Sequence, residues 1–223
     1  MSSGMPPPLS AFTTAERRLI TRLDTPARVQ AFLNDLPYNR ESRGETLRSF
    51  RGVVRHGRVH CLEAVLVAAT ILEQHGYPPL ALSFESIDLL DHVIFAYRHA
   101  RGWGSVARSR DPGLHGRKAV FRSPRALALS YVDPYVDFTG AVRGFAVVDL
   151  RGLDGYDWRL SLRNVWKVER YLIDFPHKRL RTSRARIDRL RRWYVQEMKE
   201  TGGCKPTTYR GRQHWSALPA EFR

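Results

Sequence analysis

Residues 60–72 read His60-Cys61-Leu62-Glu63-Ala64-Val65-Leu66-Val67-Ala68-Ala69-Thr70-Ile71-Leu72, and this stretch decides the fold. Apolar side chains recur in it at helical spacing, at Leu62, Val65, Leu66, Ala69 and Leu72. The remaining positions are nearly as apolar, which is typical of a buried helix. Gly76 suits a left-handed C-terminal cap, and the two prolines after Tyr77 prevent the helix from continuing.

Cys61 lies in the first turn of this expected helix, where unpaired backbone N–H groups and the helix dipole favour a thiolate. His92 follows at the start of an alternating strand, in the order expected of a thiol nucleophile and its base. Buried cysteines are most often small packing residues, so only the helix start and the downstream histidine together indicate catalysis. We interpret Cys61 and His92 as a nucleophile–base pair.

The composition indicates an ordinary folded protein. The chain has 223 residues, of which 43% are hydrophobic and 11% aromatic, enough for one generous core. Two cysteines, Cys61 and Cys204, cannot form a disulfide framework. The N-terminus lacks the basic and apolar pattern of a signal peptide, and no apolar run reaches membrane-spanning length. These features predict a cytoplasmic protein.

The net charge of +15 is concentrated toward the C-terminus. The basic residues cluster in one run, residues 178–192. A run of this kind favours binding to nucleic acid, to an acidic partner protein or to anionic lipid headgroups, although a solvated arginine-rich helix face has the same sequence pattern. The run carries one acid, Asp188, and these basic residues: Lys178, Arg179, Arg181, Arg184, Arg186, Arg189, Arg191 and Arg192.

The order of expected elements predicts an α+β fold, with helices first, then an antiparallel sheet, then helices. A first helix is expected to start at Thr13 or Thr14, and further helices are expected near residues 25–36, 61–72, 125–131, 160–173 and 183–200. Residues 46–54 lead into the helix at 61–72. Strands are expected at 80–84, 92–97, 103–109 and 144–150. In the last helix a core-facing stripe is formed by Ile187, Leu190, Tyr194 and Met198. We divide the chain into a disordered N-terminus (1–12), a core (13–155), a basic helical extension (156–200) and a tail (201–223).

A third polar group is needed to orient the histidine of a thiol–imidazole pair. If the strands at 92–97 and 103–109 form a hairpin that turns near residues 100 and 101, Ser109 faces His92. Asp111 is then the diagonal neighbour on the same face. Either residue is a candidate for this role, and a slip of one residue in register would turn it away.

Several short motifs carry a resemblance to a known family. They are Leu36-Pro37-Tyr38-Asn39, His60-Cys61-Leu62-Glu63-Ala64, Asp91-His92-Val93, Trp103-Gly104-Ser105 and Leu127-Ala128-Leu129-Ser130-Tyr131. Over residues 30–150 the chain resembles the transglutaminase-like fold of papain-like cysteine enzymes, and more narrowly a bacterial group of unassigned activity. The resemblance implies Cys61 as nucleophile and His92 as base. It also implies an aspartate on the next strand, where this chain departs from the pattern, because Ser109 takes the facing position and Asp111 is the first acid.

The chemistry of such a site is acyl transfer. A thiolate attacks an amide or ester carbonyl and leaves an acyl-enzyme, which water or an amine resolves. The backbone N–H of Cys61 would stabilise the oxyanion, and Tyr38 and Asn39 are further candidates, although both residue types are common in turns. Neither cysteines nor histidines show metal-ligand spacing, and no cofactor is expected.

The sequence therefore predicts a cysteine hydrolase or acyltransferase that acts on an amide-type bond of a protein or peptide-like substrate. The alternative is a catalytically inactive relative that binds nucleic acid or an acidic partner through its basic C-terminal helices. The irregular third position favours this alternative.

Overall fold

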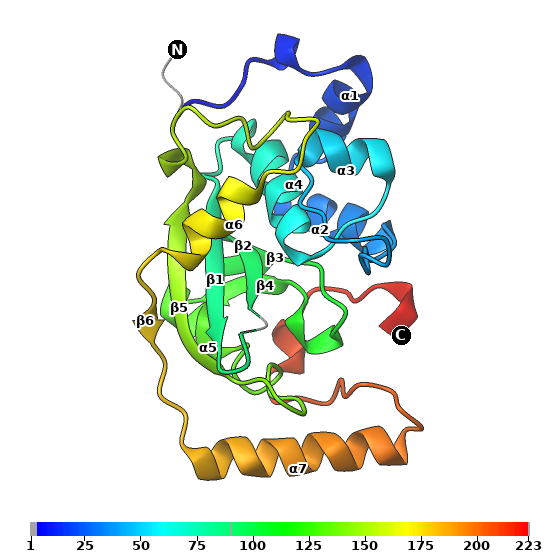
Figure 1. Ribbon diagram of the computed structural model, residues 1–223, viewed down its shortest axis with the longest axis vertical. Helices are drawn as coiled ribbons and strands as arrows, with labels where there is room; N and C mark the ends of the chain where they lie inside the picture. Colours follow the sequence, from blue (N-terminus) through cyan, green and yellow to red (C-terminus); the bar gives the residue numbers. More distant parts are fainter. Residues whose placement is uncertain (1–3, 90, 223) are drawn as a thin grey trace.

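The structure, a computed structural model, describes residues 4–89 and 91–222. In this part of the chain an open antiparallel sheet of six strands, in the order β4-β3-β2-β1-β5-β6, combines with seven α-helices in an α+β fold (Figure 1). The strands are β1 (Leu80–Ser86), β2 (His92–His99), β3 (Gly102–Val106), β4 (Arg117–Phe121), β5 (Val142–Asp149) and β6 (Lys178–Arg179). The helices are α1 (Thr14–Arg22), α2 (Pro26–Asp35), α3 (Phe50–His56), α4 (Cys61–Glu73), α5 (Pro124–Leu129), α6 (Trp166–Ile173) and α7 (Arg184–Glu200).

Helix α4 is the centre of the molecule, as its sequence predicts. Every residue from Leu62 to Glu73 is buried, and Gly76 after it adopts a positive φ of 82°. Five other helices begin after a serine or threonine whose side chain accepts a hydrogen bond from a backbone N–H of the first turn. These N-cap residues are Thr13, Thr25, Ser49, Ser123 and Ser183.

The period-two pattern of the strands separates two cores. Val93 and Phe95 pack on the side of α4, whereas Ile94 and Ala96 pack on the opposite face with residues of α5 and the segment after it. The alternation expected for this strand is thus confirmed, and it places α4 on one face of the sheet and α5 on the other.

The hairpin register expected for β2 and β3 is found, with Phe95 opposite Val106 and His99 opposite Gly102. However, β3 ends at Val106 instead of continuing to residue 109. The physical reason is Gln30, whose side-chain amide donates to the Ala107 carbonyl and accepts from the Ala107 N–H, each at 2.9 Å. Residues 107–116 therefore leave the sheet as a loop, which we call the 107–116 loop. Strands β4 and β6 were not anticipated, and α6 begins at Trp166, not at 160.

The ends of the chain are more integrated than the sequence suggests. Residues 1–3 of the expected disordered segment lie outside the described residues, but Phe12 is buried against Phe50. Trp158 and Val168, from the expected extension, belong to the main core, and β6 pairs with β5. Helix α7 runs along the bottom of the view in Figure 1, where Tyr194 contacts Phe138. The tail after α7 returns to the edge of the sheet.

The buried stripe expected on α7 is found in part. Tyr194 is buried and its ring meets Phe138 edge-on, whereas Ile187, Leu190 and Met198 are half-buried. Within residues 4–89 and 91–222, no helix has the length and apolarity needed to cross a lipid bilayer.

Candidate active site

Cys61 is the first residue of α4, and its side chain lies in a cleft of about 580 Å³. His92, at the first position of β2, lines the same cleft, as does His60, the residue that caps α4. Helix α6 contributes one wall and the 107–116 loop another. The pair that the sequence predicts, Cys61 and His92, is therefore brought together at the junction of the central helix and the central sheet.

The His92 ring is held by a backbone carbonyl. Its Nε2 lies 3.0 Å from the oxygen of Leu114, and its plane lies nearly parallel to the ring of Phe84, at 8°. Because a carbonyl only accepts, Nε2 carries the proton and donates it. This leaves Nδ1 as the nitrogen that can exchange a proton with the Cys61 thiol, and it fixes the tautomer as a triad carboxylate would.

His60 is held in the same way, from the other side. Its Nε2 donates to the Thr46 carbonyl at 2.8 Å, so its Nδ1 is also left for Cys61. One thiol is thus within hydrogen-bonding reach of two imidazoles, each oriented by a main-chain carbonyl of a different loop. His60 is a functional candidate that the sequence analysis missed, although its position directly before Cys61 was the signal.

Electrostatics at this site favour the thiolate. Burial raises the pKa of Cys61, but hydrogen bonds from His60 and His92 and the positive charges of both rings outweigh it, and the pKa falls to about 5. Burial lowers the pKa of His60, whereas its hydrogen bond to Cys61 and the charges of Cys61 and Glu63 raise that pKa to about 9. A thiolate and an imidazolium are therefore the stable pair near neutral pH.

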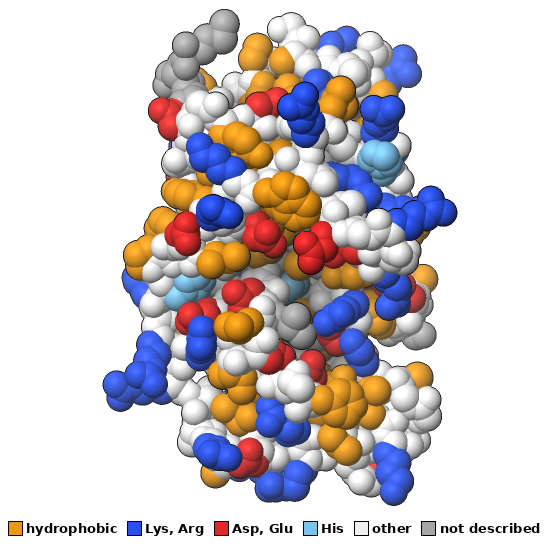
Figure 2. All heavy atoms as spheres, in the orientation of Figure 1, with side chains coloured by type: hydrophobic (Ala, Val, Ile, Leu, Met, Phe, Trp, Pro, Cys, Tyr) orange, Lys and Arg blue, Asp and Glu red, His pale blue; other side chains and the backbone are white. Residues whose placement is uncertain are grey.

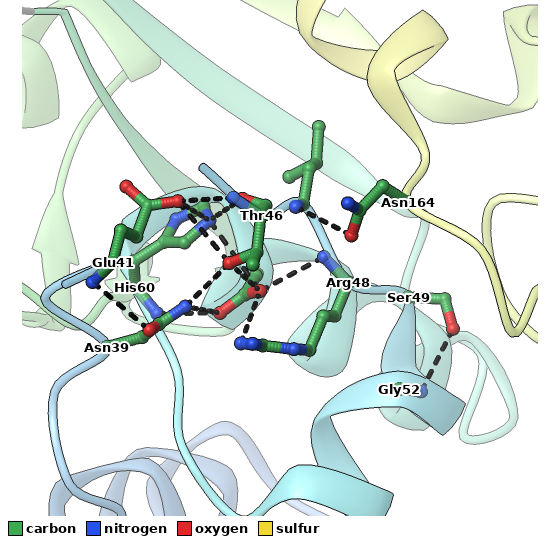
Figure 3. Close-up of polar contacts among 10 residues, drawn as sticks. Asn39, Glu41, Thr46, Arg48, Ser49, Gly52, His60 and Asn164 are labelled. Atoms are coloured by element: carbon green, nitrogen blue, oxygen red, sulfur yellow. Dashed lines mark hydrogen bonds and ion pairs between the residues drawn. The ribbon is translucent and has the colours of Figure 1, made fainter. Parts of the chain in front are cut away.

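Hydrogen bonds link Thr46 to Asn39, Glu41 and His60 (Figure 3). The Glu63 carboxylate anchors the loop that carries Thr46. This carboxylate is fully buried and accepts hydrogen bonds from the backbone N–H of His60 and of Arg48, both at 3.0 Å. The Arg48 guanidinium lies 3.2 Å away and balances the charge. The Glu63 carboxylate is directed into this network, where its negative charge raises the pKa of His60.

Two buried arginines hold the 107–116 loop, which carries the Leu114 carbonyl. Arg117 is fully buried and donates to the carbonyls of Gly113 at 2.6 Å and His115 at 2.7 Å. Arg108 donates to the Ser109 carbonyl at 3.2 Å. Burial lowers the pKa of Arg117 to about 10, so its guanidinium remains charged at neutral pH. The orientation of His92 therefore depends on these arginines.

Neither candidate for the third polar group is bonded to His92. Asp111 lines the cleft, but its carboxylate forms an ion pair with Lys205 and lies 3.8 Å from Arg110. The Ser109 hydroxyl accepts from the Asp111 N–H at 3.0 Å. Because β3 ends at Val106, the chain turns away before either residue can face His92, and the Leu114 carbonyl takes their place.

Tyr38 and Asn39 have different positions. Tyr38 lines the cleft, and burial together with the charge of Cys61 raises the pKa of its phenol, which therefore keeps its proton. Asn39 is buried away from the cleft, where its amide donates to Thr46 at 2.8 Å and to Glu63 at 3.3 Å. Of the two oxyanion candidates, only Tyr38 has a donor that can reach a molecule in the cleft.

The basic residues lie apart from this site, on β6, on α7 and in the segment between them. Arg186 pairs with Asp133 at 2.7 Å, and Arg191 donates to the carbonyls of Asp137 and Thr139. Both contacts fasten α7 to the body. In the part of the chain that the structure describes, the other six form no ion pair and are exposed: Lys178, Arg179, Arg181, Arg184, Arg189 and Arg192. No group of three or more His, Cys, Asp or Glu within that part could hold a metal ion.

Comparison with known proteins gives little. No protein-family model matches the chain. No curated protein matches it either. Among solved structures, one described as "Legionella pneumophila LapG (EGTA-treated)" is similar to the chain at a TM-score of 0.35, with 12% identity over 66% of this chain and 86% of that chain. This likeness is distant.

Proposed function

We propose that this protein is a cysteine hydrolase or acyltransferase that acts on an amide-type bond of a peptide-like substrate. One observation carries the proposal: the Cys61 thiol lies in a cleft between two imidazoles that lower its pKa to about 5. The resemblance of its sequence motifs to transglutaminase-like cysteine enzymes points to the same reaction class. A buried cysteine that only fills space needs neither imidazole.

The reaction follows from the positions of the hydrogens. The Cys61 thiolate attacks the carbonyl carbon, and the developing oxyanion is stabilised by the Cys61 N–H at the start of α4 and by the Tyr38 hydroxyl. His92, protonated at Nδ1, gives this proton to the leaving amine as the C–N bond breaks. The thioester that remains is attacked by water or by a second amine, with His92 Nδ1 as the base, and the thiolate is released.

His60 has a separate role in this mechanism. Its imidazolium stabilises the resting thiolate, so that His92 is free to change its protonation state during turnover. The acid–base role belongs to His92 because a single carbonyl orients it, whereas His60 is surrounded by acceptors. Glu63 and Glu41 carboxylate oxygens lie 3.7 and 3.9 Å from its Nε2, and these charges favour the permanently protonated form.

Acylation by p-nitrophenyl acetate tests the proposal. In a Cys204→Ser background, which leaves one thiol, we expect a single acetyl group on Cys61 by peptide mass spectrometry, followed by its slow release. Cys61→Ala should abolish the adduct without unfolding the protein, because a small residue at a helix start leaves only a modest cavity. His92→Ala should slow both steps. An adduct that persists in Cys61→Ala would show that the nucleophile is assigned wrongly.

A further inference from the structure

The charge of the cleft is opposite to the charge of the protein. The chain has 37 Lys and Arg against 22 Asp and Glu, yet among the described residues seven carboxylates line the cleft against one of those cations, Arg110. Figure 2 shows acidic side chains around the hollow in the middle of this face, with Lys and Arg spread over the surrounding surface. A cleft lined by one sign of charge concentrates ligands of the other sign.

One group of carboxylates lies on the His60 side of Cys61. Glu41 is close to His60, and Glu45 and Glu169 line the cleft as exposed side chains. Within residues 4–89 and 91–222, neither Glu45 nor Glu169 forms an ion pair with a Lys or Arg. Burial and then the charges of Glu45 and Glu41 raise the pKa of Glu169, although the charge of His60 lowers that pKa. A cation between these carboxylates would relieve their repulsion.

A second group lies on the His92 side. Asp91 directly precedes His92 and is exposed, and its carboxylate accepts a hydrogen bond from the Ser86 N–H at 2.8 Å. Asp137 accepts from the N–H groups of Thr139 and Gly140. Over the described ranges, neither forms an ion pair with a basic side chain. Asp111 differs, because Lys205 already neutralises it.

An aromatic side chain beside Glu45 and Glu169 is independent evidence that the cleft binds a cationic ligand. Trp166 lines the cleft, three residues before Glu169 on α6, so the two side chains share one face of the helix. A large apolar ring is normally buried, but Trp166 is 41% exposed. The face of an indole binds ammonium and guanidinium groups, most strongly where carboxylates are adjacent.

We propose that the substrate is a cationic peptide segment, with Lys or Arg side chains seated against the carboxylates on the two sides of Cys61. This inference rests on the proposed function and gives its substrate class. Glu45, Glu169 and Trp166 bind one basic side chain, and Asp91 and Asp137 bind another, with the attacked carbonyl over Cys61 between them.

Protection of Cys61 by short peptides tests this without requiring turnover. In the Cys204→Ser protein, iodoacetamide alkylation of Cys61 is followed with increasing concentrations of acetyl-Ala-Lys-Ala-Lys-Ala-amide or its Gln and Glu counterparts. We expect the Lys peptide to protect at a concentration at least about tenfold below that of the Gln peptide, equivalent to about 1.4 kcal/mol. The Glu peptide should not protect.

The variant Glu45→Gln/Glu169→Gln should remove most of this advantage. The matched control, Asp154→Asn/Asp174→Asn, removes two exposed acids that do not line the cleft and should keep it. Equal protection by Lys and Glu peptides, or an advantage that survives Glu45→Gln/Glu169→Gln, would overturn the inference. The proposed function fails separately: a slow, ordinary thiol would refute it, while the order of protection could still be measured at alkaline pH.

Discussion

At the scale of single residues, the site depends on carbonyl oxygens that no sequence pattern displays. Cys61 and His92 could be predicted, because a thiol at a helix start and a histidine at a strand start are local features. The orienting groups could not, since Leu114 and Thr46 act through their main chains and any side chain would serve. His60 could have been recognised from its place beside Cys61.

The hydrogen bond between His92 and the Leu114 carbonyl leads to a prediction about Asp111. If the carbonyl orients His92, Asp111→Asn should leave the pKa of Cys61 unchanged and the acylation rate nearly so. Loss of a true triad aspartate costs about 10⁴-fold in rate. The ion pairs with Lys205 and Arg110 are lost, and such partly exposed pairs each contribute at most about 1 kcal/mol to stability. A large fall in acylation rate with an intact fold would restore Asp111 to the triad.

At the scale of elements, the helices and the hairpin follow from local patterns, but the 107–116 loop does not. The expected register was correct, and the error lay in the length of β3, which Gln30 terminates from a distant helix. Such a contact joins residues far apart in the sequence, so periodicity cannot reveal it. The same holds for Arg117, which a sequence reader would place on the surface and which is fully buried.

The lowered pKa of His115, in the 107–116 loop, leads to a prediction about how the stability of the protein depends on pH. Burial, and then the charge of Arg108, lowers the pKa of His115 to about 3, whereas an unfolded chain gives about 6.5. Its contribution to stability is therefore fully present above pH 6.5 and is lost as the pH falls toward 3. Urea unfolding of His115→Gln should show a weaker loss of stability with acid than wild type. Parallel curves over this range would contradict the assignment.

At the scale of the whole molecule, the C-terminal tail completes the sheet edge. The Trp215 ring stacks on the Arg117 guanidinium, with 4.7 Å between the ring centroid and Cζ. The Ser216 N–H donates to the Gly116 carbonyl at 3.0 Å, and Glu221 forms an ion pair with Arg108 at 2.8 Å. From the sequence, residues 201–223 are expected only to form a tail. Its packing depends on partners in the loop, which only the fold brings near.

We therefore expect Trp215→Ala to destabilise the protein by about 3 kcal/mol, the range found for large aromatic residues removed from a packed site. Trp215 is 3% exposed and contacts Tyr209 as well as Arg117. Urea denaturation measures the change. Trp193→Ala, at a half-buried position on α7, is the comparison and should cost less. Equal, small losses would mean that the tail does not brace the loop.

The distribution of charge over the molecule separates the proposed enzyme from the binding alternative. The variant Arg184→Gln/Arg189→Gln/Arg192→Gln removes three exposed charges from α7, none of which lines the cleft. If the protein is an enzyme of the proposed kind, Cys61 acylation should be unchanged in this variant. Retention on immobilised heparin should fall and become less dependent on salt, because fewer counterions are released. Acylation that fell with retention would tie α7 to the reaction.

The rate of iodoacetamide alkylation at Cys61 as a function of pH tests the central claim most directly. Measured in the Cys204→Ser protein by peptide mass spectrometry, the rate should rise with a midpoint near pH 5, because the thiolate is the reactive form. His60→Gln and His92→Gln should each move the midpoint upward, since each removes a hydrogen bond and a positive charge. A wild-type midpoint near the ordinary thiol value of about 8.5, unmoved by either substitution, would contradict the account.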